Sequence, residues 1–489
     1  MKHFKRYVLP AIIVAVALAG WLVWRAAQPA PERLAYPEGL DSITVSAVLK
    51  PQQYSLSVTQ TLKLTNRTGE KQDAAVLRTW ANAFQSIDTS PCAADDLLYD
   101  QYYPNGFSMG GIVMAQAKAN GEAVLYRYTD ESKTVLAVPV PGGWQAGETV
   151  DLQLTYTVQV PKMAYRFGVW DDIWALGNAF AVPAVWQDGA FRTDEYLSVG
   201  DPFVSDCADY SVTVLVPQGY VCAGSGAASV STQGSQTCYT FEAPAVRDFA
   251  LVISDRFRQA RTTANGVCIT AYAQSKSQAR EMLRYARKAL DCYSDAYGAY
   301  AYDSYTLAQV TFPHGGMEYP ALSMISTDLL NEGGRELEYA VAHETAHQWW
   351  YAAVGSDSWN QAWQDEALCE FSLLKYAQQT YGRGERMDLE NARMESSLRV
   401  TVPHGVTPGA PLDYFSSMSE YKLLVYDRAA ACLCAMDRTV TLDGFLRDYY
   451  ARFAFQRATR KDFTEQLLIS TGEDFAPLMR DYLDTFILN

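Results

Sequence analysis

Two histidines and two glutamates in one short stretch constrain this chain more than any other feature. His343 and His347 are four residues apart with Glu344 between them, and Glu366 follows after eighteen further residues. On a helix, residues four apart project from the same face, so both imidazoles can bind one metal ion while Glu344 handles a water molecule. Glu366 would add a third ligand and leave one position open, as in catalytic zinc sites. The sequence therefore predicts one Zn²⁺ per chain.

The alternative interpretation is a surface helix with two solvated histidines. The chain has only five histidines in 489 residues. The residues around the motif are apolar on almost every side of the predicted helix, which indicates burial: Ala340, Val341, Ala342, Ala346, Trp349 and Trp350. Buried imidazoles and carboxylates need partners, and a metal ion supplies one. We expect a buried helix from about 335 to 354, and a second helix from about 361 to 381 that carries Glu366.

Length and charge limit the classes of protein. A chain of 489 residues is too long for one core and predicts two or three domains. The net charge of −15 argues against nucleic acid as a partner. Cys222 and Cys238 flank a Gly/Ser-rich segment and are the best candidates for a disulfide, although buried core cysteines are the alternative.

The N-terminus carries a targeting signal. Lys2, Lys5 and Arg6 precede an uncharged run at residues 7–24, and eighteen residues on a helix span about 27 Å, close to the thickness of a hydrocarbon core. We expect residues 1–25 to be a membrane anchor, with the bulk of the chain outside the cytoplasm. A cleaved signal peptide and a secreted protein are the alternative. Residues 26–38, rich in Ala and Pro, predict a linker.

Alternating patterns and turn signals divide the rest of the chain. Residues 39–262 alternate apolar and polar positions between turns such as Pro104-Asn105-Gly106, and they predict an all-β domain, a sandwich or saddle. Residues 263–489 mix a few strands with long helices, including the metal helix. The expected fold class is therefore α+β and multidomain.

The chain resembles the M1 family of zinc aminopeptidases, a gluzincin family. The family pattern of HExxH, eighteen residues and Glu is met by His343, Glu344, His347 and Glu366. The family's GxMEN loop is similar to Gly315, Gly316, Met317 and Glu318, with Tyr319 where Asn is usual. The resemblance implies a thermolysin-like catalytic domain after the all-β domain, in a short form without the long C-terminal helical domain.

The resemblance also implies roles for three parts of the site. Glu318 would bind the free α-amino group of a peptide, with Gly315, Gly316 and Met317 shaping the loop; a turn carboxylate is the alternative. Tyr426, sixty residues after Glu366, would stabilise the oxyanion, although Arg428 and Ala429 depart from the family pattern. An ordinary core tyrosine is the alternative, and Tyr414 and Tyr421 are weaker candidates.

These features predict a zinc metallopeptidase that removes the N-terminal residue from peptides with a free N-terminus, with Glu344 as general acid and base. Glu370, one turn beyond Glu366, is either a carboxylate that supports a metal ligand or a surface residue. His314 is expected to be structural or to line the substrate site. An endopeptidase, a tripeptide-trimming enzyme of the same clan and an inactive membrane-anchored scaffold are the alternatives.

Overall fold

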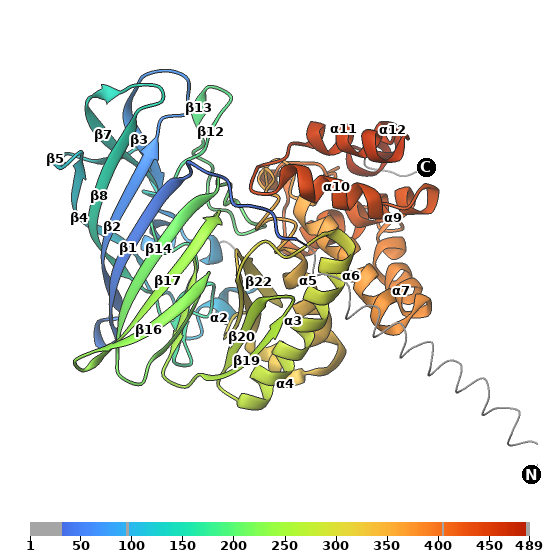
Figure 1. The fold of residues 1–489 in the computed structure, drawn as a ribbon, viewed down its shortest axis with the longest axis horizontal. Helices are drawn as coiled ribbons and strands as arrows, with labels where there is room; N and C mark the ends of the chain where they lie inside the picture. The colour runs from blue at the N-terminus through green and yellow to red at the C-terminus, as the bar shows by residue number, and fades with distance from the viewer. Residues whose placement is uncertain (1–31, 94–96, 403–404, 486–489) are drawn as a thin grey trace, which may run out of the picture.

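The computed structural model describes residues 32–93, 97–402 and 405–485 (Figure 1). The segment predicted as a membrane anchor, 1–25, and the first part of the predicted linker, 26–31, lie outside these residues. In the part of the chain that is described, no helix has the length and apolar character needed to cross a membrane.

The first half of the chain is built on an eight-stranded sheet, in the order β16-β17-β14-β1-β2-β8-β4-β5. Its neighbours are antiparallel except for β1 and β14, which run parallel. Alternate side chains of β1, β2, β8 and β14 are buried, as the period-two pattern requires. The strands are β1 (Asp41–Lys50), β2 (Ser55–Thr65), β4 (Gly111–Ala119), β5 (Glu122–Val124), β8 (Thr149–Gln159), β14 (Ala208–Pro217), β16 (Ala227–Gln233) and β17 (Gln236–Val246).

Three smaller sheets complete this all-β part, in the orders β15-β18-β10-β9, β11-β3-β7-β6 and β12-β13. Their strands are β3 (Gln72–Arg78), β6 (Arg127–Tyr128), β7 (Val135–Trp144), β9 (Phe167–Trp170), β10 (Ile173–Leu176), β11 (Val182–Pro183), β12 (Trp186–Gln187), β13 (Ala190–Phe191), β15 (Val221–Gly224) and β18 (Leu251–Ser254). Short helical turns join them: η1 (Pro51–Gln53), η2 (Trp80–Gln85), η3 (Pro91–Ala93) and α2 (Tyr99–Tyr102).

Cys222 and Cys238 do not form the disulfide that their spacing suggested. Both are buried free thiols. The Gly/Ser-rich segment between them is not a simple turn, because it contains β16, which places Ser231 opposite Cys238. Cys222 lies on β15 in a different sheet. The alternative of buried core cysteines therefore describes this pair.

The second half begins with a five-stranded sheet in the order β19-β20-β21-β23-β22. Its three inner strands run parallel, and β19 and β22 are antiparallel edges. Because β19 starts at Arg258, this sheet takes residues from the segment predicted as all-β. The strands are β19 (Arg258–Ala264), β20 (Val267–Ala273), β21 (Ser304–Val310), β22 (Gly316–Tyr319) and β23 (Leu322–Ser326).

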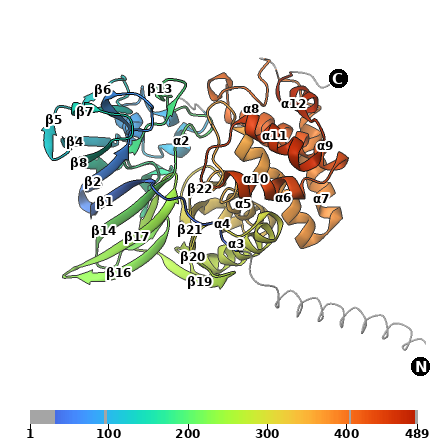
Figure 2. The same cartoon turned by 45° about the horizontal axis from the view of Figure 1, so that its top comes forward.

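Helices make up the remainder, and they lie beside the β-rich half of the molecule (Figures 1 and 2). The helix α3 packs its apolar face on β19, β20 and α5. The helices are α3 (Lys276–Tyr297), α4 (Thr327–Glu332), α5 (Gly334–Ala346), α6 (Trp363–Tyr381), α7 (Arg383–Glu390), α8 (Met418–Tyr421), α9 (Ala429–Thr439), α10 (Asp443–Phe453), α11 (Arg460–Thr471) and α12 (Ala476–Leu483), with the 3₁₀ turn η5 (Leu412–Tyr414) and the π-helical segments η4 (Asn391–Glu395) and η6 (Lys422–Arg428).

The metal helix ends earlier than its apolar pattern predicted. α5 stops at Ala346, with His347 as its C-cap in helical conformation, rather than near residue 354. Beyond it the backbone turns back, because Ala352 N donates to His347 O and Val354 N donates to Trp349 O. This compact turn, instead of a helix face, buries Trp349, Trp350, Ala352, Ala353 and Val354.

Candidate active site and metal centre

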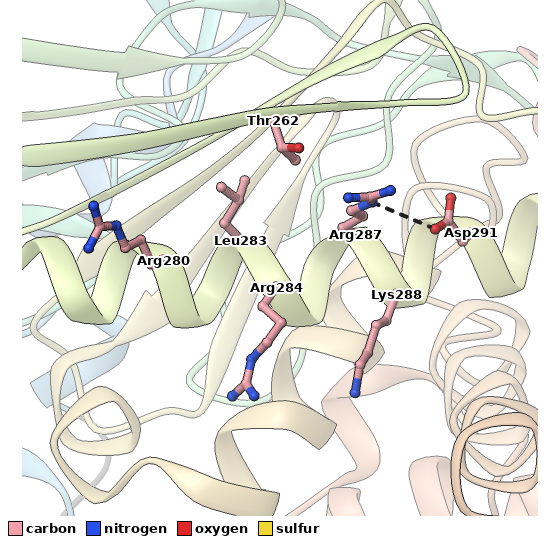
Figure 3. Close-up of a pocket in the computed structure, with 7 residues that line it drawn as sticks. All are labelled: Thr262, Arg280, Leu283, Arg284, Arg287, Lys288 and Asp291. Carbon is pink, nitrogen blue, oxygen red and sulfur yellow. Dashed lines mark ion pairs between the residues drawn. The ribbon is translucent and has the colours of Figure 1, made fainter.

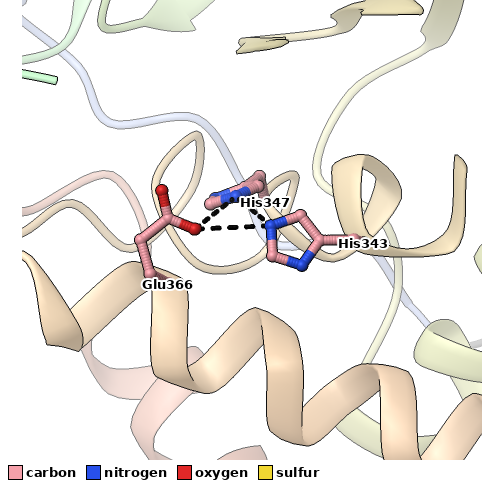
Figure 4. A group of neighbouring side chains, drawn as sticks. All are labelled: His343, His347 and Glu366. Carbon is pink, nitrogen blue, oxygen red and sulfur yellow. Dashed lines mark hydrogen bonds and ion pairs between the residues drawn. The ribbon is translucent and has the colours of Figure 1, made fainter. Parts of the chain in front are cut away.

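Three ligand atoms converge between α5 and α6 (Figure 4). His343 Nε2 and His347 Nε2 are 3.1 Å apart, and Glu366 Oε2 lies 3.3 Å from the first and 3.4 Å from the second. Atoms that bind one zinc ion tetrahedrally at about 2 Å are separated by about 3.3 Å. Glu366 Oε2 is buried and has no hydrogen-bond partner among the described residues. The geometry therefore fits a zinc ion held by His343, His347 and Glu366.

The outer nitrogens of the two imidazoles are oriented by neighbours. His347 Nδ1 lies 3.1 Å from the carbonyl oxygen of Trp350, so this nitrogen carries the proton and Nε2 offers a lone pair. His343 Nδ1 lies 3.1 Å from Glu370 Oε1, and Glu370 is buried rather than on the surface. Contacts of this kind fix the orientation of metal-binding histidines.

Glu344 projects toward the strand that runs past the metal centre. It is buried, and its Oε2 has no hydrogen-bond partner in the described parts of the chain. Burial raises the pKa of Glu344 to about 7. A Cβ atom on Gly316 of β22 would lie 2.3 Å from Glu344 Oε1, so only glycine leaves room for this carboxylate. Glu344 thus has the position of a general base.

Glu318 comes from the edge strand β22 and faces the same centre. A carboxylate oxygen of Glu318 lies within 4.8 Å of ligand atoms of Glu344 and His347. Glu318 is 6% exposed, and burial raises its pKa well above its usual range. No hydrogen bond or ion pair to this carboxylate is found among the described residues. Such a group is available to a cationic ligand.

A narrow pocket of about 10 Å³, room for about one water molecule, lies beside Glu318. It is lined by Asp201, Phe203, Met317, Glu318, Tyr319, Tyr351, Ser358 and Asp365. Asp201 belongs to the all-β half, where it forms an ion pair with Arg166, and Asp365 Oδ1 accepts from Glu366 N at 2.7 Å. The pocket therefore lies between the two halves of the chain and is acidic.

Tyr426 contacts two of the predicted metal ligands. Its hydroxyl donates to Glu366 Oε1, and its ring stacks on His343 at 5.7 Å with an interplanar angle of 9°. Tyr421 packs edge-on against Tyr426, whereas Tyr414 is 64% exposed. Of the three tyrosines, Tyr426 is the one that contacts the predicted ligands.

The remaining residues of the loop have structural contacts. Gly315 O accepts from Ser326 N at 3.0 Å, which joins β22 to β23. The Tyr319 hydroxyl donates to Asn178 Oδ1 at 3.1 Å, and Asn178 Nδ2 donates to Asp248 Oδ2 at 2.6 Å. Burial raises the pKa of Asp248 to about 7. Tyr319, which replaces the family's Asn, therefore links β22 to the all-β half.

His314 lies outside the metal centre. Its Nε2 is 2.9 Å from the Tyr102 hydroxyl, and its ring packs near Tyr165 and Phe312. Burial and the charge of Arg166 lower the pKa of His314 to about 4. The residue is therefore a neutral structural histidine at neutral pH.

Sequence reasoning missed Asp201, Asp365 and Tyr351 as residues of the pocket. Asp365 adjoins Glu366, so its nearness to the metal centre was visible in the sequence. Asp201 is brought there by folding of a distant segment, which a single sequence does not reveal. Tyr351 has a positive φ of 124°, a strained backbone of the kind often found near functional sites.

A second hollow lies along α3, away from the residues of the metal centre (Figure 3). It is lined by Thr262, Arg280, Leu283, Arg284, Arg287, Lys288 and Asp291. Three of its cations already have acidic neighbours, in the pairs Arg284–Glu281, Arg287–Asp291 and Lys288–Glu338. It is a solvated basic face and holds none of the predicted site residues.

Comparisons with known proteins agree on one family. The peptidase family M1 domain matches residues 281–482. Aminopeptidase RNPEPL1 of Homo sapiens is 27% identical over 189 residues, covering 35% of this chain and 25% of that protein. Aminopeptidase B of Rattus norvegicus is 25% identical over 190 residues, covering 35% and 28%. The matches thus span less than a third of these relatives' length.

Solved structures resemble nearly the whole chain. An M1 zinc metallopeptidase from Deinococcus radiodurans has a TM-score of 0.65 at 17% identity and covers 92% of this chain and 95% of its own. A mutant of that metallopeptidase bound to a Tyr-Ser-Ala substrate has a TM-score of 0.65 at 17% identity, covering 94% and 98%. These matches show the fold alone: an all-β half followed by a half with a five-stranded mixed sheet and helices.

Proposed function

Because residues 281–482 of this chain match the peptidase family M1 domain, we propose that the protein is a zinc aminopeptidase that hydrolyses the N-terminal residue from peptides. The observation that carries the proposal is the position of Glu318. Within the described parts of the chain no ion pair to its buried carboxylate is found, and this carboxylate lies beside Glu344 and His347. A peptide ammonium bound there would place the first peptide bond at the predicted metal centre.

The metal and the chain have separate roles in this proposal. Held by His343, His347 and Glu366, one Zn²⁺ would polarise the scissile carbonyl and make a water molecule in the site more acidic. Glu344 takes the proton of the attacking water and delivers it to the leaving amine.

Two further side chains act on the substrate. The Tyr426 hydroxyl, which lies on Glu366 in this structure, turns toward the oxyanion as negative charge develops there. Glu318 fixes the free amine, which restricts cleavage to the first residue. Glu318 thus positions the substrate through its free amine, and Tyr426 stabilises the negative charge on the carbonyl oxygen.

An endopeptidase or tripeptide-trimming enzyme of the same clan remains the alternative function. The Deinococcus radiodurans mutant bound to Tyr-Ser-Ala makes short peptides a reasonable substrate class for this chain. The two functions differ in their need for a free amine. An N-acetylated peptide cleaved as fast as its free-amine counterpart selects the endopeptidase.

The inactive scaffold is disfavoured by what the divergent residues do. Tyr319 donates to Asn178. Arg428 donates from Nη2 to the carbonyl oxygens of Ser397 and Val400, at 2.6 Å each. Two of the three departures from the family pattern, Tyr319 and Arg428, therefore have structural partners away from the metal ligands.

We further propose that the protein acts outside the cytoplasm, held by residues 7–24. The support is the uncharged run itself and the basic residues before it. Fractionation of cells that express the full chain tests this. Recovery in the membrane fraction, with the catalytic half digested by protease added outside, is expected; full protection from the protease contradicts it.

A Glu344→Gln variant tests the proposed function. It should keep one zinc per chain and lose turnover of aminoacyl-arylamides by at least about 100-fold, since general acid–base catalysis contributes that much. Full activity of this variant at normal zinc content would refute the mechanism.

A further inference from the structure

We propose that Arg393 is a positioning residue that ties the metal ligand His343 to the segment bearing Tyr426. The inference rests on the proposed function for its kinetic part. Arg393, Glu370 and Asp427, which form the link, lie outside the HExxH motif and the glycine-rich loop. Arg393 contacts no predicted ligand, so its action is through other side chains.

A continuous chain of polar contacts leads from His343 to the tyrosine segment. Glu370 Oε1 lies 3.1 Å from His343 Nδ1. Arg393 Nη1 lies 2.7 Å from Glu370 Oε2. The same guanidinium donates from Nε to Asp427 Oδ1 at 3.1 Å, and Asp427 adjoins Tyr426 in the chain. Arg393 thus joins two carboxylates that come from different helices.

Both ends of this link act on the same imidazole. Glu370 meets the outer nitrogen of His343, and Tyr426 stacks on the face of the His343 ring. If Arg393 shifted, the support behind His343 and the helix carrying Tyr426 would shift together. The link therefore couples the orientation of a metal ligand to the position of the oxyanion donor.

Local backbone structure supports a functional role for this link. Arg393 lies on η4, and Tyr426 and Asp427 lie on η6; both are π-helical segments. π-Helical turns interrupt α-helices at a cost and are frequent at functional sites. Here the two wide turns pack against one another. They place the guanidinium between the acidic residues.

Charge and shape explain why arginine suits this position. The side chains of Glu370 and Asp427 are 4% and 15% exposed, and Arg393 is 23% exposed. Without a cation between them, two largely buried carboxylates would lie beside one another without compensation. The planar guanidinium reaches both acids with separate nitrogens, whereas the single ammonium of lysine is a point charge.

The test uses Arg393→Met and Arg393→Lys, with Arg386→Met as matched control. Arg386 on α7 is 16% exposed and pairs with Asp437 at 2.9 Å and Glu390 at 3.7 Å, none of which is at the metal centre. Arg393→Met should weaken zinc binding in a chelator competition and lower kcat, each by about 10- to 100-fold, with KM nearly unchanged. Arg393→Lys should recover part of both losses, and Arg386→Met should change neither.

Asp427→Asn separates positioning from general stability and serves if Arg393→Met does not fold. This variant weakens only the contact between Arg393 and residue 427, beside Tyr426. Therefore kcat should fall several-fold while zinc affinity stays at the wild-type value. Wild-type zinc affinity in folded Arg393→Met, an equal loss in Arg386→Met, or unchanged kcat in Asp427→Asn would each overturn the proposal. A wild-type protein without aminopeptidase turnover would refute the proposed function instead, and the zinc competition would still test the link to His343.

Discussion

Replacing Gly316 with alanine should remove most of the activity without removing the metal. A Cβ atom at this position would lie 2.3 Å from Oε1, 2.4 Å from Cδ and 2.5 Å from Cγ of Glu344, where ordinary contacts begin at 3.4 Å. The Glu344 side chain must therefore move by about 1 Å, and misplacement of this size costs about 100-fold in rate. That loss corresponds to about 2.7 kcal/mol in the activation free energy.

The assay is steady-state hydrolysis of an aminoacyl-arylamide, with zinc content measured on the same sample. Gly316→Ala should lower kcat about 100-fold, with one zinc per chain and little change in KM, because Glu344 is neither a ligand nor a binding group. Gly315→Ala is the control, since the nearest atom to its added Cβ would be Leu329 Cδ1 at 3.4 Å. Full kcat in Gly316→Ala, or an equal loss in Gly315→Ala, would refute the steric reasoning.

Four further predictions concern the oxyanion donor, the link between the two halves and the metal. Tyr426→Phe should lower kcat by about 100- to 1,000-fold at normal zinc content, as removal of an oxyanion donor does; an unchanged kcat would exclude that role. Tyr319→Phe should cost about 1–3 kcal/mol in urea unfolding, because it leaves Asn178 Oδ1 buried without its donor; an unchanged unfolding midpoint would contradict this. The folded-state pKa of Asp248, about 7 against an ordinary 3.8, means that the folded protein holds the extra proton, so stability should fall by up to about 4 kcal/mol as pH rises from 4 to 7. Asp248→Asn should reduce the dependence of stability on pH, and an equal pH dependence in the variant and the wild type would contradict this. Removal of zinc by a chelator should lower the Tm and abolish turnover, since a ligand at 100 times its Kd stabilises by about 2.7 kcal/mol; an unshifted Tm would count against a bound metal.

The metal centre was predictable from the sequence because its geometry is local. His343 and His347 face one way on any helix, and Glu366 needs only one further helix packed alongside. The predicted end of the metal helix was wrong because residues 349–354 are apolar. A buried compact turn contains the same residue types as a buried helix, so composition does not distinguish them. Periodicity reports that a side chain is buried and does not report which backbone buries it.

The pocket and the link through Arg393 could not be predicted, because both depend on distant segments. Asp201 reaches Glu318 only when the two halves of the chain pack together. Arg393 is 23 residues beyond Glu370, and nothing in the sequence between them indicates that the chain folds back to bring the two side chains together. The order of strands in the large sheet could not be predicted for the same reason. β1 pairs in parallel with β14, a strand far away in the sequence, and an alternating pattern does not identify the partner strand.

In the proposed function, the buried carboxylate of Glu318 beside the zinc centre selects peptides with a free amine. The most direct measurement compares hydrolysis of a peptide with that of its N-acetylated counterpart by the zinc-loaded protein, in the wild type and in Glu318→Gln. Acetylation should lower kcat/KM at least about 100-fold in the wild type, since it removes a charge-assisted contact. The ratio of kcat/KM between the free and the acetylated peptide should be much smaller in Glu318→Gln. Equal cleavage of both peptides by the wild type would contradict this prediction.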